Sequence, residues 1–313
     1  MLKQLIKKGL NAVDDLAVAT GHNAAGPESL VNVLFHSLYQ NEAQLASRDL
    51  APNQNVTVAN FRDFVEKMLE SGCTIVSPVQ IDAGLAPGRR YLSITFDDGY
   101  LNNVLALEVL DQFRFPATFF VSTDHVQQNK AFWWDAFSRE FSRSGVSPDQ
   151  QKSEIEQLKV MTPEKIEACL CQRFGPAVLR PCGDIDRPFT PHELGQFALN
   201  PWVHVGNHTR DHAILTNCTP AEMVDQITAC QDALAVLLPS PIPTATARML
   251  PCRRPKQPGC VWASPWRRAA HGFRWTATPA CCSADSFFMA ARTSGGNAAC
   301  WVPASFPAIR SRR

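Results

Sequence analysis

The middle of the chain alternates between strand and helix patterns, and this succession restricts the fold more than any other feature. Tyr91–Phe96 (YLSITF) is a β-rich run, Asn103–Phe113 has helical spacing, and Pro116–Thr123 (PATFFVST) is a second β-rich run. A strand, a helix and a second strand in succession indicate a βαβ unit and a parallel sheet. The pattern predicts an α/β domain, in which a parallel barrel is the expected closure of the sheet.

The flanking segments continue the same pattern. Their apolar spacing predicts a strand (VNVLF) before His36, a helix over Val58–Ser71, a strand after Gly72, a mainly helical stretch over Ala131–Leu179, a strand at Trp202–Val205 and a helix from Thr219 to Leu238.

Bulk properties exclude several classes of protein. The chain has 313 residues and a formal net charge of +1, which gives no reason to expect nucleic acid or an acidic partner. No apolar run approaches the roughly 20 residues of a transmembrane helix. Residues 1–28 are predicted to form an N-terminal helix or extension, either packed on the domain or resting on a membrane surface. Charged residues interrupt its apolar residues, so it does not have the pattern of a secretory signal.

The cysteines argue against a structural zinc site in the first part of the chain. Six of the 11 cysteines precede residue 239, and none of them forms a C-x-x-C pair. We expect free thiols in a reducing compartment.

Two adjacent carboxylates, Asp97 and Asp98, follow the first β-rich run and precede Gly99. Burying two carboxylates beside a strand is costly unless something uses them, and active sites gather at the carboxyl ends of parallel strands. The alternative is that Asp-Asp-Gly only forms a turn with side-chain caps.

Two histidines, His208 and His212, follow the strand predicted at Trp202–Val205. At this spacing, both can reach one metal ion from a tight loop, although a pair of surface histidines is the alternative. One carboxylate with two histidines makes an open three-ligand site of the kind that catalytic zinc uses, and the second carboxylate is then available as a base.

These two motifs together resemble those of a known family. TFDDG followed by H-T-x-x-H is similar to the first two motifs of the NodB-homology polysaccharide deacetylases, carbohydrate esterase family four. VLFHSL, FRDFVEKMLESGCTIVS and PATFFVS resemble the family's flanking elements in the same order, so the resemblance covers about Leu30–Leu238.

The resemblance implies an enzyme that hydrolyses amide bonds on an irregular (β/α) barrel. It assigns the catalytic base to Asp97 and the metal ligands to Asp98, His208 and His212. It implies a divalent metal, zinc, and an acetylated polysaccharide or oligosaccharide as substrate, mostly at N-acetyl and in some members at O-acetyl groups. Without a signal peptide, we expect the chain in the cytoplasm or on the cytoplasmic side of a membrane, although a glycan substrate suggests the envelope or a membrane-bound precursor.

Two smaller features have open interpretations. Phe132–Asp135 (FWWD) has aromatic side chains that either line a sugar-binding groove or pack in the core. His36 lies either near the site or, as we favour, in the core as a hydrogen-bonded histidine.

The chain changes character near residue 239, which gives a division into residues 1–28, a deacetylase-like domain at 29–238 and a tail at 239–313. The tail is rich in arginine, proline, cysteine and tryptophan, and Asp285 is its only acidic residue. A basic nucleic-acid tail would favour lysine, and a disordered tail would be poor in aromatic residues. We favour a third interpretation, a segment translated out of frame and disordered.

Translation of this segment in another reading frame supports the frameshift interpretation. With synonymous codons chosen for Pro239–Arg248 (PSPIPTATAR), reading from the third base of the Ser240 codon gives AYPNGDRT, which resembles the family's third motif. As written, the chain has neither a recognisable third motif nor a recognisable late histidine for a general acid. We therefore expect an incomplete barrel and a strongly impaired activity. The alternatives are a degenerate carbohydrate-binding protein that keeps its metal and a non-functional product of a damaged gene.

Overall fold

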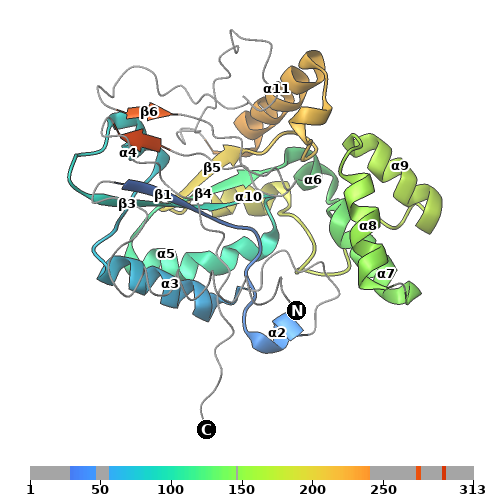
Figure 1. The fold of residues 1–313 in the computed structure, drawn as a ribbon, viewed down its shortest axis with the longest axis horizontal. Helices are drawn as coiled ribbons and strands as arrows, with labels where there is room; N and C mark the ends of the chain where they lie inside the picture. The colour runs from blue at the N-terminus through green and yellow to red at the C-terminus, as the bar shows by residue number, and fades with distance from the viewer. Residues whose placement is uncertain (1–28, 47–55, 146, 240–272, 276–290, 294–313) are drawn as a thin grey trace, which may run out of the picture.

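A parallel sheet forms the centre of the molecule. The computed structural model describes residues 29–46, 56–145, 147–239, 273–275 and 291–293 (Figure 1). The sheet contains, in spatial order, the strands β1 (Ser29–Phe35), β3 (Arg90–Phe96), β4 (Ala117–Val121) and β5 (Val203–Asn207), with β2 (Thr74–Ile75) pairing with β3. All of these pairs are parallel. The predicted α/β class with a parallel sheet is confirmed.

The pairing register brings the carboxyl ends of four strands to one rim of the sheet. β1 pairs with β3 along its whole length, from Ser29 opposite Arg90 to Phe35 opposite Phe96. On its other edge, β3 pairs with β2 near its start and with β4 at its end, where Phe96 lies opposite Phe119. Among the described residues, the sheet ends at β1 and β5, so its closure into a barrel stays a prediction.

A row of phenylalanines packs in the sheet just below that rim. Phe35, Phe96 and Phe119 lie side by side on three neighbouring strands, all fully buried, with ring centroids 5.3 and 4.7 Å apart. Phe61 of α3 (Val58–Glu70) packs edge-on against two of them. From the other end of the row, Phe197 of α10 (Pro191–Phe197) packs edge-on against Phe119. These contacts fix the strands against one another close to the candidate site.

Helices cover the sheet on both sides (Figure 1). α3 packs beside α5 (Leu107–Phe113), which follows the 3-10 turn η1 (Leu101–Ala106). α11 (Pro220–Leu237) contacts β5, α6 (Thr123–Gln128) and α10. The helices predicted over Val58–Ser71, over Asn103–Phe113 and from Thr219 to Leu238 are therefore present, the second with a 3-10 first half.

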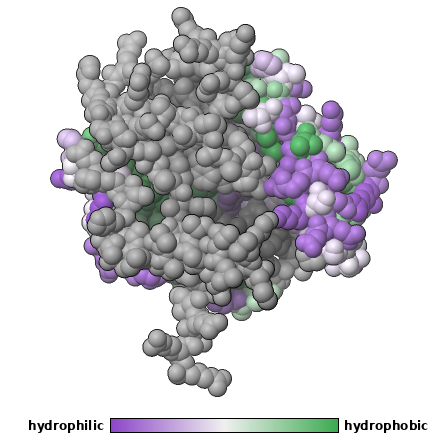
Figure 2. All heavy atoms as spheres, viewed as in Figure 1, coloured by the Kyte–Doolittle hydropathy of each residue, from purple (hydrophilic) through white to green (hydrophobic). Residues whose placement is uncertain are grey.

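A second, smaller core lies in the helical stretch between β4 and β5. It consists of α7 (Trp133–Ser144), α8 (Pro148–Leu158) and α9 (Pro163–Phe174), whose apolar side chains form a cluster separate from the sheet core. These helices lie at the right in Figure 1, and much of the surface at that side is hydrophilic in Figure 2. The prediction of a mainly helical segment over Ala131–Leu179 is confirmed.

Several helices start at a threonine or serine that caps them. Five of these caps form reciprocal capping boxes, which satisfy backbone donors that the first helical turn leaves free; the cap residues are Thr57, Ser77, Ser147, Thr190 and Thr219. Of these five residues, only Thr219 was predicted as the start of a helix. The short elements α2 (Glu42–Ala46), α4 (Pro78–Ala83) and η2 (Leu215–Asn217) were not predicted.

Several predictions fall on parts of the chain outside the described residues. Residues 1–28 lie outside them, as does the tail apart from residue 239 and two strands, β6 (Phe273–Trp275) and β7 (Ala291–Thr293), which pair antiparallel. The three-part division, the shifted frame and the disorder of the tail therefore stay predictions. The six cysteines before residue 239 are free. None of the described helices is long and apolar enough to cross a membrane.

Candidate metal centre

Two loops at the rim of the sheet bring the predicted site residues together. Asp97 and Asp98 follow β3, and the loop that contains His208 and His212 follows β5. The Nε2 atom of His212 lies 3.0 Å from Oδ1 of Asp98, and that of His208 lies 3.4 Å from the same oxygen. One potential ligand atom from each of these three residues lies within 4.8 Å of the others, so they form a candidate metal site.

The backbone reaches this geometry through residues with left-handed conformations. The backbone φ values are +78° at Asp98, +64° at Thr209 and +56° at His212. Residues other than glycine seldom adopt such values. Such residues cost about 1–3 kcal/mol each and gather at functional sites, where the surrounding structure holds them. Two of the three are candidate ligands, so the strain lies in the residues that would bind the metal.

Gly99 is required where it stands. It has a φ of +88°, and a Cβ atom at this position would lie 2.9 Å from Cγ1 of Val121. Since Val121 is buried in β4, the turn after Asp98 passes too close to the neighbouring strand for any side chain. A turn at Asp-Asp-Gly was one of the two interpretations of the sequence, and the structure adds the close approach to β4.

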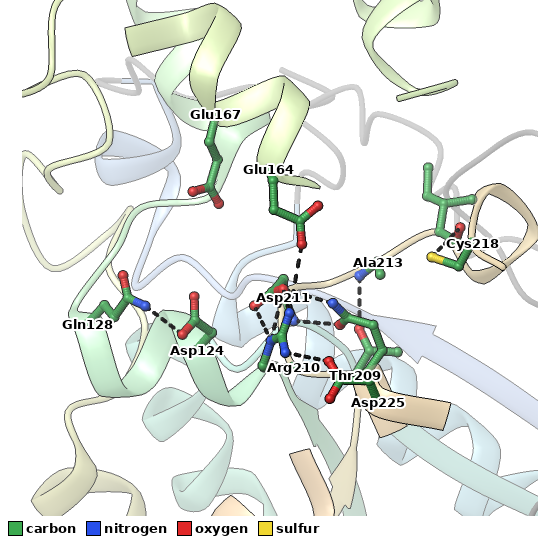
Figure 3. A network of polar contacts seen from close by, with 12 residues as sticks. Asp124, Gln128, Glu164, Glu167, Thr209, Arg210, Asp211, Ala213, Cys218 and Asp225 are labelled. Carbon is green, nitrogen blue, oxygen red and sulfur yellow. Dashed lines mark hydrogen bonds and ion pairs between the residues drawn. The ribbon is translucent and has the colours of Figure 1, made fainter. Parts of the chain in front are cut away.

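A polar network holds the loop after β5 (Figure 3). The guanidinium of Arg210 donates to both carboxylate oxygens of Asp211 and to Asp225 of α11. Asp211 also accepts a hydrogen bond of 2.8 Å from Gln226 of the same helix. Within the loop, the backbone N–H of Ala213 donates to the Thr209 hydroxyl at 2.9 Å. The loop is thus attached to α11. The sequence analysis gave these residues no role.

The burial of Asp98 supports a bound cation. Its side chain is 1% exposed, and among the residues that the structure describes, none makes a hydrogen bond of acceptable geometry to either carboxylate oxygen. A buried carboxylate without donors is costly unless a cation compensates it. Burial alone raises the pKa of Asp98, but the positive fields of His212 and His208 outweigh it and hold that pKa well below its usual range. The carboxylate is therefore ionised, and a divalent metal fits this set of one oxygen and two nitrogen donors.

Asp97 differs from its neighbour. Its side chain is 19% exposed, and its Oδ2 lies 3.9 Å from Nε2 of His208. Burial raises the pKa of Asp97 above its usual value, and the opposing field of His208 offsets only part of this effect. For His208, burial lowers the pKa, but Asp97 and Asp98 outweigh it, so the pKa is raised. A raised carboxylate pKa beside a metal site is the property expected of a general base.

His36 lies near the site, contrary to the core role that we favoured. It follows β1 at the same rim, where the backbone N–H of Asp97 donates to the Phe35 carbonyl at 2.9 Å. The imidazole is close enough to lower the pKa of both Asp97 and Asp98. Its place directly after a buried strand, like that of Asp97, was the signal in the sequence that could have indicated this.

The FWWD segment packs in the second core instead of lining a groove. Trp133 is 9% exposed and Trp134 is 8% exposed, so neither offers a free ring face for a sugar. Trp134 instead contacts His212, with ring centroids 4.6 Å apart. Asp135 is also buried, and the Tyr100 hydroxyl donates to it at 2.6 Å. The sequence pattern gave no reason to connect this segment with the histidine loop.

Comparisons with known proteins identify a family for this chain. The sequence model of the family described as "Polysaccharide deacetylase" matches residues 85–248, about half of the chain. No curated protein matches.

Similar solved structures include a polysaccharide deacetylase from Bacillus cereus, with 15% identity, a TM-score of 0.40, and coverage of 67% of this chain and 48% of that one. A deacetylase from Streptococcus pyogenes in complex with acetate has 14% identity, a TM-score of 0.40 and coverages of 66% and 68%. A de-N-acetylase from Aggregatibacter actinomycetemcomitans has 12% identity, a TM-score of 0.42 and coverages of 67% and 75%. The chain spans about half the length of the first of these structures. The family match extends over both metal-site motifs, and by it the chain belongs to the polysaccharide deacetylase family, whose members act on amide bonds.

Proposed function

We propose that this protein removes acetyl groups from an N-acetylated polysaccharide or oligosaccharide, with Asp98, His208 and His212 as ligands of a divalent metal ion. The observation that carries the proposal is the buried carboxylate of Asp98, which faces two imidazoles and has no hydrogen bond from the described part of the chain. Two nitrogens and one oxygen form the three-ligand set that catalytic zinc uses, so zinc is the proposed ion. O-acetyl esters are the alternative substrates.

The neighbouring side chains have separate tasks in this reaction. A divalent ion at this site would supply Lewis acidity toward water and the acetyl carbonyl. Asp97 would accept the proton of the attacking water, for which its raised pKa suits it. After the carbon–nitrogen bond breaks, the leaving amine needs a proton. We assign its delivery to His36, because that imidazole is near Asp97 and follows a strand at the same rim.

A second candidate function is carbohydrate binding without turnover. It is favoured by residues 239–313, in which the family's third motif and a late histidine are not recognisable. Losing an oxyanion donor costs about 10²–10³-fold in rate. In that case the chain would keep its metal and its fold but hydrolyse little. We propose the cytoplasm or the cytoplasmic side of a membrane as its location.

Metal binding and acetate release, measured on the full chain, separate these functions. The assays are zinc titration against a chromophoric chelator and acetate release from an acetylated chito-oligomer. Asp97→Asn should keep zinc binding and lower turnover by about 10²–10⁴-fold, whereas Asp98→Asn should lose both. Zinc binding without acetate release supports the binding protein. Absence of zinc binding in the wild-type chain would exclude both functions.

The reading frame of the gene decides which full chain should be tested. Sequencing the coding DNA across Leu234–Arg248 shows whether a one-base insertion or deletion restores AYPNGD. If it does, the corrected chain is the one to assay, and full turnover is expected of it. If the present sequence is correct, the measured rate should be strongly reduced.

A further inference from the structure

We propose that Trp134 is a positioning residue for the metal site: its indole holds the ring of His212, and a buried hydrogen-bonded chain from Asp135 through Tyr100 holds the indole. This inference rests on the proposed function, because it concerns a ligand of the proposed metal ion. It gives the helical segment between β4 and β5 a role in the site that the two sequence motifs do not reveal.

The first step is the contact between two rings. The rings of Trp134 and His212 are 4.6 Å apart between centroids and inclined at 61°, an edge-to-face arrangement. Phe132 stacks on the indole of Trp134 at 4.9 Å, and its ring also lies 6.4 Å from that of His212. In the described part of the chain, the side chain of His212 makes no hydrogen bond to a carbonyl or hydroxyl group. Apart from Nε2 facing Asp98, the His212 ring contacts other aromatic rings, namely Trp134, His208 at 4.7 Å and Phe132 at 6.4 Å. The indole has the shortest centroid distance of the three, and we infer that it holds the His212 ring.

The second step is the chain of hydrogen bonds behind the indole. Nε1 of Trp134 donates to the Tyr100 hydroxyl at 2.9 Å, and that hydroxyl donates to Oδ2 of Asp135 at 2.6 Å. All three side chains are buried, with exposures of 8%, 3% and 2%. A buried indole N–H or hydroxyl without a partner costs about 1–3 kcal/mol, so each member restricts the position of the next.

The hydrogen bonds among Asp135, Tyr100 and Trp134 connect the two loops that contain the proposed metal ligands. Tyr100 lies two residues after Asp98, on the loop that follows β3, while His212 lies on the loop that follows β5. Trp134 contacts Tyr100 through its N–H and His212 through its ring. α7 therefore sets the separation of a carboxylate ligand and an imidazole ligand that come from different strands. Partners of this kind, one shell beyond the ligands, typically change metal affinity by about 10–100-fold.

The chain offers a matched control for this role. Trp133 is the neighbouring residue, is equally buried and packs edge-on against Trp134 at 5.5 Å, but has no contact with His212 among the described residues. Trp134→Phe and Trp133→Phe each replace an indole by a phenyl ring on α7. Only the first removes the donor to Tyr100 and the edge against His212.

The experiment measures zinc affinity of the full chain by chelator competition, together with the visible absorption spectrum of the cobalt-loaded protein, which reports coordination geometry. We expect Trp134→Phe to weaken zinc binding about 10–100-fold and to change the cobalt spectrum. We expect Trp133→Phe to stay within about twofold of wild type in affinity, with an unchanged spectrum.

A second pair of variants serves if Trp134→Phe does not fold. Asp135→Asn keeps an acceptor for the Tyr100 hydroxyl and should retain zinc affinity, whereas Asp135→Ala removes the acceptor and should weaken it. Equal affinity for all variants and wild type, or equal losses in Trp133→Phe and Trp134→Phe, would overturn the positioning role alone. A wild-type chain that binds neither zinc nor cobalt would instead refute the metal site, and this inference with it.

Discussion

Replacing Gly99 by alanine tests how the turn after Asp98 is built. The left-handed φ of +88° costs a residue with a Cβ about 1–2 kcal/mol. The new Cβ would also lie 2.9 Å from Cγ1 and 3.2 Å from Cγ2 of Val121, and overpacking of a buried strand costs about 1–3 kcal/mol. The two contributions together predict that Gly99→Ala lowers the free energy of unfolding by about 2–5 kcal/mol.

The control is a glycine that also has a left-handed φ but has no atom close to the position of a Cβ. Gly145 ends α7 with a φ of +68°, and a Cβ there would meet no atom within 4 Å. Gly145→Ala should therefore cost only about 1–2 kcal/mol. Any effect of the substitution on the unfolded chain is similar in both variants and cancels in the comparison.

Urea denaturation of both variants, of Val121→Ala and of the double variant Gly99→Ala/Val121→Ala provides the measurement. Since Val121→Ala removes both Cγ atoms, the cost of Gly99→Ala should be about 1–3 kcal/mol smaller in that background. The reasoning is refuted if Gly99→Ala costs no more than Gly145→Ala. It is also refuted if the two substitutions at Gly99 and Val121 are additive.

Three further predictions concern the titratable groups. His36→Asn should lower kcat about 10²–10⁴-fold with little change in zinc affinity, and an unchanged kcat in acetate-release assays would exclude the proton-donor role. Zinc affinity should fall as the pH drops below the raised pKa of His208, because a protonated imidazole cannot bind a metal; chelator competition between about pH 8 and 5.5 measures this, and an affinity independent of pH would contradict it. Burial raises the pKa of Asp135 to about 8, so the folded state binds a proton that the unfolded chain, with its pKa of about 3.9, has lost. The free energy of unfolding should therefore fall as the pH rises between these values. Urea denaturation in the presence of a chelator should show a smaller slope for Asp135→Asn than for wild type.

Local patterns were sufficient to predict the strands and the residues at their ends. The runs before Asp97 and His208 are apolar and short, and parallel pairing brings their carboxyl ends to one rim. The prediction that Asp98, His208 and His212 lie together depended on this rule and on the family resemblance, and the structure brings them together. Their roles as ligands stay proposals.

Contacts between distant segments were not visible in the sequence. Trp134 contacts His212 across 78 positions of the chain, and no periodicity within α7 indicates that one of its aromatic residues turns toward the histidine loop. For the same reason His36 was assigned to the core, because its distance from Asp97 depends on which strand pairs with β3. Pairing order is a property of the whole sheet, and single-sequence patterns do not contain it.

The phenylalanine row below the rim has a consequence for how this protein can change. Phe35, Phe96 and Phe119 align three strands through buried apolar contact, and none of them is a candidate metal ligand. Substitutions just beyond the strand ends can therefore alter the chemistry while the sheet still folds, whereas substitutions in the row alter whether a rim exists at all. Natural selection for catalysis and natural selection for folding thus act on adjacent but separate residues, and a descendant can lose catalysis while it keeps the fold.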